Sequence, residues 1–168
     1  RQKQGLILQW GIGRNITLAT LDKYSNKGWL KEELEAEIAK TLSEKVNVKA
    51  NSIFDPAGCL SGGNQQKVIV AKLLSTDLKI IILDEPTKGV DVGAKSAIHE
   101  MMNELVCQGY GIIMVSSEMP EVLGMSDRIV VMREGRVTAV LDRKSATQEL
   151  ILEAAMVSKT EEPVKSAV

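Results

Sequence analysis

The strongest constraint on the fold is a run of four branched apolar residues, 80–83, that ends directly in Asp84 and Glu85. Because the run is continuous rather than alternating, it predicts a β-strand buried on both faces. A second apolar run at 111–115 predicts another strand, and apolar residues spaced as on a helix lie between the two. This strand–helix–strand order implies a parallel sheet. Reactive groups gather beyond the carboxyl ends of such strands, which makes Asp84 and Glu85 candidate site residues.

Helices and one hairpin account for the rest of the chain. Residues 15–50 are predicted to be helical, with an apolar stripe at Leu30, Leu34, Ile38 and Leu42 and with glutamates on a solvated face. Strands at 128–132 and 136–141 are predicted to form an antiparallel hairpin around Glu134-Gly135. Ser145 and Gln148 predict a capping box for a closing helix that ends near Met156. The polar tail, 158–168, is expected to be disordered.

A glycine-containing turn before a predicted helix forms the second candidate site, in the phrase Leu60-Ser61-Gly62-Gly63-Asn64-Gln65-Gln66. Ser61 occupies the N-cap position. The unpaired N–H groups and the positive dipole end of a helix start attract an anion, and glycine allows close approach to the backbone. Taken alone, the phrase is also compatible with an ordinary serine-glycine turn before a helix.

The two motifs occur in the order expected of an ATP-binding cassette, and the phrase Glu85-Pro86-Thr87-Lys88-Gly89-Val90-Asp91 resembles the D-loop of that family. The sequences of residues 64–67 and 87–95 are similar to those in the second cassette of bacterial importers of the ribose, galactose and xylose type. The resemblance runs from about residue 1 to about Met156. It implies an α/β fold of the P-loop NTPase class, as a nucleotide-binding-domain fragment over 1–157. A helical subdomain (15–60) would precede the signature helix, partial parallel sheet and C-terminal antiparallel hairpin (61–157).

The resemblance also implies roles for single residues. Asp84 would hold Mg²⁺, directly or through water, and Glu85 would be the general base. The signature residues and the D-loop aspartate would contact ATP held by an opposing cassette: Ser61, Gly62, Gly63, Gln65 and Asp91. Ser117 occupies the position at which most cassettes have a histidine that contacts the γ-phosphate. A serine hydroxyl donates one hydrogen bond but carries no positive charge.

Some expected parts do not occur among the 168 residues. No G-x-x-x-x-G-K-S/T loop is present to hold phosphates, and the glutamine loop would precede Arg1. The phosphate-loop portion is therefore expected to be absent, and the chain is expected to be a fragment that is inactive alone. In this importer subgroup the second cassette is commonly the weaker one, so donating the signature is a more secure role than hydrolysis.

The amino-acid composition limits which classes of partner are expected. Lys plus Arg total 21 against 22 for Asp plus Glu, and only 5 aromatic residues are present, so no nucleic-acid partner is expected. Cys59 and Cys107 are expected to be reduced thiols. No apolar run reaches the length of a membrane span, so membrane association would come through a partner.

We therefore expect the ATP-binding and ATP-hydrolysing subunit of a monosaccharide importer at the cytoplasmic face of the membrane, using ATP and Mg²⁺. Its partners would be a second cassette, permease subunits and, indirectly, a periplasmic sugar-binding protein. The alternative is a non-catalytic cassette, or a truncated remnant, that only completes a partner's ATP site or has no activity.

Overall fold

The computed structural model describes residues 5–26, 28–76 and 78–156, so the predicted tail at 158–168 lies outside the described residues. The chain divides into two compact units, residues 1–113 and 114–168, and each is described by itself. The boundary falls inside a strand, β4 (Gly111–Val115). The predicted subdivision into 15–60 and 61–157 stays a prediction.

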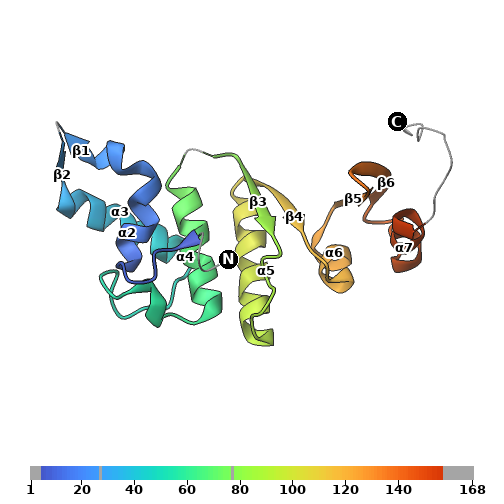
Figure 1. Cartoon of the computed structure of the whole chain (residues 1–168), viewed down its shortest axis with the longest axis horizontal. Helices are drawn as coiled ribbons and strands as arrows, with labels where there is room; N and C mark the ends of the chain where they lie inside the picture. Colours follow the sequence, from blue (N-terminus) through green and yellow to red (C-terminus); the bar gives the residue numbers. More distant parts are fainter. Residues whose placement is uncertain (1–4, 27, 77, 157–168) are drawn as a thin grey trace. The chain divides into compact units, whose positions relative to one another are not determined.

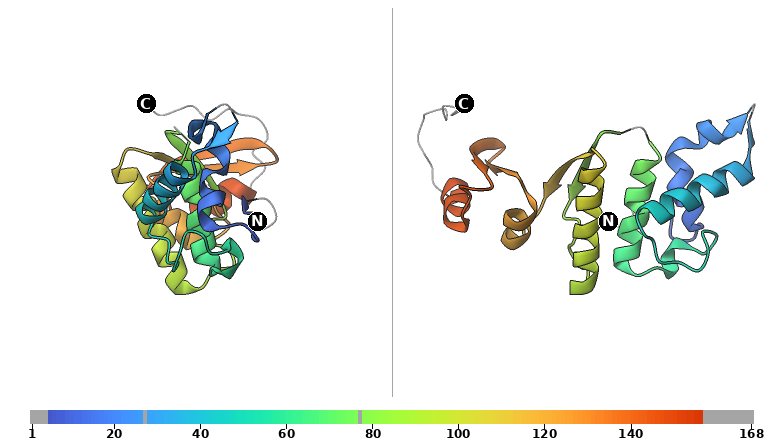
Figure 2. Two further views of the ribbon diagram at one scale, coloured as in Figure 1. Left: turned by 90° about the vertical axis from the view of Figure 1, so that its left-hand side faces the viewer. Right: turned by 180° about the vertical axis from the view of Figure 1, so that it is seen from behind.

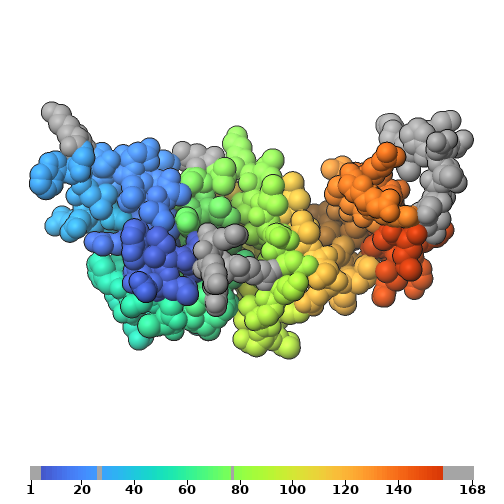
Figure 3. Space-filling model, in the orientation of Figure 1, coloured from blue at the N-terminus to red at the C-terminus, as the bar shows by residue number. Residues whose placement is uncertain are grey.

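The first unit begins with a helical part in which short elements accompany two longer helices, α3 (Glu32–Lys45) and α4 (Gly62–Leu74) (Figure 1). Blue and teal segments of this part pack against one another in the space-filling view (Figure 3). The predicted helical region is confirmed for most of its length, but a two-residue-per-strand hairpin interrupts it. The elements are α2 (Ile12–Thr17), η1 (Leu18–Tyr24), β1 (Ser25–Asn26), β2 (Trp29–Leu30), α3 (Glu32–Lys45), η2 (Ala57–Cys59) and α4 (Gly62–Leu74).

The buried face of α3 differs from the predicted stripe. Glu35, Ala39 and Ser43 are the buried residues of this helix, whereas Leu34 keeps 38% of its surface exposed. Glu35 is buried because the Thr17 hydroxyl donates a 2.6 Å hydrogen bond to its carboxylate. The prediction that the glutamates form only a solvated face is therefore wrong at Glu35, since a polar partner on α2 determines which face turns inward.

A buried asparagine holds the segment before α2. The Asn15 side chain is fully buried; its Oδ1 accepts from the Ile7 amide at 2.8 Å and its Nδ2 donates to the Ile7 carbonyl at 3.0 Å. Nδ2 also lies within hydrogen-bond distance of the carbonyls of Trp10 and Gly11. One side chain thus satisfies backbone groups of a loop that has no ladder of its own.

The second half of the unit has the predicted strand–helix–strand order: β3 (Ile80–Asp84), α5 (Val92–Cys107) and β4. The strands β3 and β4 are neighbours in a two-stranded sheet. The Gly111 amide donates to the Lys79 carbonyl at 2.8 Å, so the two strands begin side by side. The predicted parallel arrangement is confirmed.

Burial on β3 alternates, which corrects the prediction of a strand buried on both faces. Ile81 and Leu83 are 1% and 4% exposed, whereas Ile80 and Ile82 are 60% and 65% exposed. A parallel strand is enclosed on both faces only when a layer covers each of them. In the described part of the chain one face of β3 lacks such a layer.

Helices α4 and α5 lie side by side and run in the same direction (Figures 1 and 2). Their amino ends meet where Gly63 faces Ala94. A Cβ atom built on Gly63 would lie 2.8 Å from the Cβ of Ala94, closer than two such atoms approach in proteins. The missing side chain at Gly63 therefore sets the separation of the two helix starts.

The second unit is built on the predicted hairpin. Strands β5 (Arg128–Arg133) and β6 (Arg136–Asp142) pair antiparallel, with a register shift between Val131 and Met132. Ile129 and Val131 pack with Ile151 of α7 (Gln148–Met156), and residues of α6 (Met119–Met125) cover this cluster. Figure 2 shows α7 beside the hairpin.

The cap of α7 lies closer to the helix than the sequence predicts. Helix α7 begins at Gln148, and the Thr147 hydroxyl accepts from the Leu150 amide at 3.3 Å, so Thr147 is the N-cap. Ser145 instead donates to the Asp142 carbonyl at 3.1 Å in the preceding turn. The hydrogen bond from its own backbone amide, followed by that from the Thr147 hydroxyl, lowers the pKa of Glu149 below its ordinary value.

Both cysteines are free, as expected. Among the residues that the structure describes, none of the helices has the length and hydrophobicity needed to span a bilayer.

Replacing Gly63 with alanine should destabilise the first unit, because the new methyl group overlaps Ala94. We expect a loss of about 1–3 kcal/mol in the free energy of unfolding, measured by urea denaturation of the 168-residue chain. Gly62→Ala is the matched control, since its Cβ would meet Val90 at an ordinary 3.8 Å and should cost nothing. Ala94→Gly in the Gly63→Ala background should destabilise less than Ala94→Gly does in the native background, where it costs roughly 0.5–1 kcal/mol as a glycine within a helix. Additive losses of the two substitutions would refute the overlap.

Replacing Thr147 with alanine should weaken α7, because the Leu150 amide loses its acceptor. The expected cost is about 1 kcal/mol, read as faster hydrogen exchange of the Leu150 amide. Ser145→Ala is the control, and an equally large effect from it would show that Ser145 caps α7 after all.

The pKa of Glu149 is lowered in the folded state. Its contribution to the free energy of unfolding is therefore present above the ordinary pKa of 4.5 and is lost as pH falls through the folded pKa.

Candidate functional site

The start of α4 presents the predicted anion site. Ser61 is the N-cap of this 13-residue helix, in extended backbone conformation, and Ser61 and Gly62 are exposed. The Ser61 carbonyl accepts from the Gln65 amide at 2.9 Å, while the Ser61 hydroxyl makes no capping bond to the first turn. The amides of this turn have no carbonyl one turn earlier to bind. The predicted N-cap is confirmed, and its hydroxyl is left at the surface beside them.

The two glycines of the phrase have different surroundings. Gly62 is exposed and its Cβ position meets only Val90, so the backbone here is open to a ligand. Gly63 is buried against Ala94. Helix packing requires glycine at 63, whereas no contact of the fold requires it at 62, and the approach of an anion to Gly62 stays a prediction.

Gln65 points inward rather than to the surface. It is 8% exposed, and its Nε2 donates to the Leu60 carbonyl at 3.0 Å. This bond fixes the residue directly before Ser61. Direct contact between Gln65 and a ligand stays a prediction, and holding the loop is the role that its hydrogen bond supports.

Asp84 and Glu85 lie at the carboxyl end of β3, as the sequence predicts. Asp84 is exposed and closes the strand. Glu85 has a positive φ of 50°, a backbone conformation that costs energy for a residue other than glycine. The other two described non-glycine residues with positive φ, Asn47 and Glu134, occupy a helix end and a hairpin turn. Such strain is often retained where it aims a functional side chain.

A buried turn joins this strand end to α5. Pro86 and Thr87 are buried, Thr87 to 1% exposure, and the Lys88 amide donates to the Glu85 carbonyl at 3.2 Å. Asp91 then caps α5, its Oδ1 accepting from the Ala94 amide at 2.9 Å. The α4 contact at Ala94 thus brings Asp91 and the Ser61 turn to the same end of the helix pair.

Ser117 belongs to the second unit and is exposed after β4. Its neighbour Ser116 donates to the buried carboxylate of Glu121 and accepts from the Glu118 amide at 3.0 Å. These two bonds order the turn that carries Ser117. The role of Ser117 stays a prediction.

The residues present suit a hard cation only when other ligands complete the coordination. Among the described residues there is no group of three or more His, Cys, Asp or Glu side chains that could hold a metal ion. Mg²⁺ commonly binds one or two carboxylates and fills the remaining positions with water and phosphate oxygens. Asp84 alone therefore fits as one ligand of such an ion.

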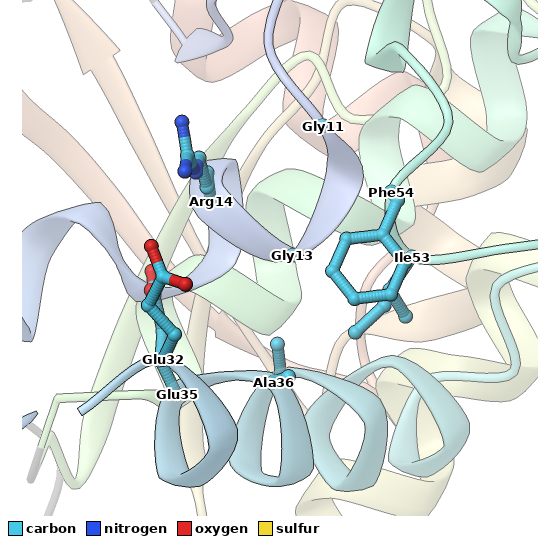
Figure 4. A pocket seen from close by; sticks show the side chains of 9 residues that line it. Gly11, Gly13, Arg14, Glu32, Glu35, Ala36, Ile53 and Phe54 are labelled. Carbon is cyan, nitrogen blue, oxygen red and sulfur yellow. The ribbon is translucent and has the colours of Figure 1, made fainter.

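A separate cavity of about 240 Å³ lies in the helical part (Figure 4). Ile53 and Phe54 form one side of it, and Glu32 and Glu35 of α3 lie on the other. None of the site residues predicted from the sequence lines this cavity, and the sequence pattern contains no signal for it.

Comparison with known proteins agrees with the fold described above. The family model described as "ABC transporter" matches residues 2–88. The ribose import ATP-binding proteins of Roseobacter denitrificans and Geobacillus kaustophilus are 49% and 48% identical over 152 and 155 residues, 90% and 92% of this chain. That of Rhizobium meliloti is 46% identical over 99% of the chain. The chain spans about a third of the length of these relatives, 30%, 31% and 33%.

Solved cassettes have the same fold. A dimeric ATP-binding cassette bound to ADP and Pi has a TM-score of 0.69 at 22% identity, covering 85% of this chain and 61% of that one. An ATP-binding cassette of an ABC transporter has a TM-score of 0.74 at 23% identity, covering 92% and 64%. With the motif residues on this fold and the family model matching residues 2–88, the chain belongs to the ABC transporter ATP-binding cassette family.

Proposed function

We propose that this chain is the signature-bearing part of the ATP-binding subunit of a monosaccharide importer. The observation that carries the proposal is the exposed Ser61–Gly62 start of α4, held against the Asp91-capped start of α5. Exposed amides, a hydroxyl and a helix dipole at one point favour a phosphate group. The sugar-import relatives are named for ribose, and the substrate class is taken from them.

In this proposal the ATP belongs to an opposing cassette. Ser61 and its neighbours would close over phosphates that the phosphate loop of the opposing cassette holds. Asp91, at the same end of the helix pair, would meet the same partner. The dimeric cassette with ADP and Pi supports a two-cassette arrangement by its fold.

The strand end at Asp84 and Glu85 would form the hydrolytic part of the second nucleotide site. Asp84 would contribute one oxygen ligand to a phosphate-bound Mg²⁺, which neutralises the charge that develops on the transferring phosphoryl group. Glu85, aimed by its left-handed backbone, would orient and deprotonate the attacking water. Ser117 would offer a neutral hydrogen bond to the γ-phosphate.

The remaining partners follow from the same proposal. Permease subunits would bring the chain to the cytoplasmic face of the membrane, and a periplasmic sugar-binding protein would act through them. A non-catalytic cassette is the second candidate, and the neutral Ser117 favours it, because that residue supplies no positive charge to the transition state.

The proposal is tested in a chimera. The matched 155-residue segment of the Geobacillus kaustophilus protein, 48% identical, is replaced by that of this chain, and steady-state ATPase is measured. Ser61→Glu should lower the rate at least about tenfold, because a carboxylate would face a phosphate in a poorly solvated gap. Ser96→Glu, at an exposed position on α5, is the control and should leave the rate unchanged.

Glu85→Gln in the same chimera separates the two candidates. A smaller loss than that from Ser61→Glu supports signature donation as the main role of this segment. An equal or larger loss would mean that the site behind Asp84 is the active one. Full activity of Ser61→Glu would refute the proposed function.

A further inference from the structure

We propose that Asn64 is a positioning residue that holds the Ser61 hydroxyl as a hydrogen-bond donor toward phosphate. The Asn64 side chain has a partner at each end of its amide: its Nδ2 donates to Ser61 Oγ at 3.1 Å, and its Oδ1 accepts from the Lys49 amide at 2.9 Å. This inference rests on the proposed function, because it concerns the phosphate that Ser61 would bind.

The orientation of the Asn64 amide is determined by its backbone partner. The Lys49 N–H can only donate, so the atom that it meets must be the carbonyl oxygen of Asn64. The NH₂ group then necessarily faces Ser61. Since that group can only donate, Ser61 Oγ accepts from it, and the hydroxyl hydrogen is directed elsewhere.

The Lys49 amide is itself held in place. Helix α3 ends in a Schellman motif: the Val48 amide donates to the Ser43 carbonyl at 3.0 Å and the Asn47 amide to the Glu44 carbonyl at 2.9 Å. Asn47 adopts the left-handed conformation that this motif requires, with φ of 53°. The buried Lys67 of α4 donates to the Asn47 carbonyl at 3.0 Å. The loop therefore presents the Lys49 N–H to Asn64 from a fixed position.

The consequence for Ser61 concerns the direction of its proton. A serine hydroxyl at an N-cap usually accepts from an amide of the first turn, which here it does not do. Instead, Asn64 occupies an acceptor position of Oγ and leaves the O–H group at the exposed surface beside Gly62. A donor so directed binds an anion without first breaking a capping bond.

The first experiment examines the geometry in the 168-residue chain itself, by hydrogen exchange of the Lys49 amide. Asn64→Ala should speed this exchange, because the amide loses its acceptor, whereas Asn64→Asp should keep it slow, because one carboxylate oxygen replaces Oδ1. Equal rates in the native chain and in Asn64→Ala would overturn the proposed orientation without bearing on the importer function.

The second experiment measures ATPase in the chimera described above. Asn64→Asp replaces the NH₂ donor with an acceptor of the same shape, so the Ser61 hydroxyl would turn toward the new carboxylate and away from phosphate. We expect kcat/KM for MgATP to fall by about tenfold or more, to at least the extent of Ser61→Ala. Asn51→Asp, the same chemical change at an exposed residue, should leave kcat/KM unchanged.

A double-mutant cycle separates positioning from a structural role. Asn64→Ala should lower kcat/KM in the native background but not in the Ser61→Ala background, because its effect passes through the hydroxyl. An equal loss in both backgrounds would show that Asn64 acts only on the fold, and no loss in either would overturn the proposal. If Ser61→Ala itself has no effect, the proposed function fails and the role of Asn64 with it.

Discussion

The approach of α4 to α5 at Gly63 is the contact on which the arrangement of the candidate site depends. Without a side chain at this position, the two helix starts come close enough for Ala94 to occupy the space where a Cβ would stand. The Ser61 turn and the Asp91 cap are attached to opposite sides of that contact. A change of a few tenths of an ångström there moves both together, since helices packed at this density transmit displacement rather than absorb it.

The segment from Asp84 to Asp91 changes a strand into a helix within a short stretch of chain, and buried groups hold it. Thr87 is enclosed, Glu85 takes a left-handed conformation, and Asp91 binds the Ala94 amide of the helix that follows. Each feature constrains the next one, because the turn is too short to relax independently. The carboxylates at the strand end and the cap at the helix start are therefore positioned by one continuous turn.

Side-chain amides also hold loops in place elsewhere in the first unit. Asn15 holds the loop before α2, Gln65 holds Leu60, and Asn64 connects Ser61 to Lys49. An amide both donates and accepts, so one residue can satisfy two backbone or hydroxyl groups in a segment that has no regular ladder. These bonds stabilise loops that the small sheet does not reach.

Local patterns in the sequence determined the elements and the motif positions. The apolar runs at 80–83 and 111–115 predict β3 and β4, Glu134-Gly135 predicts the hairpin, and Ser61 predicts the start of α4. These predictions hold because short-range backbone preferences and hydrophobic spacing decide them.

Only the tertiary structure decided which faces are buried and where polar side chains point. Glu35 turns inward because Thr17 binds it. Ile80 and Ile82 stay exposed because no described layer covers them. Gln65 and Asn64 are oriented by backbone groups 5 and 15 residues away. Such contacts join segments through space, so no periodicity along the chain contains them.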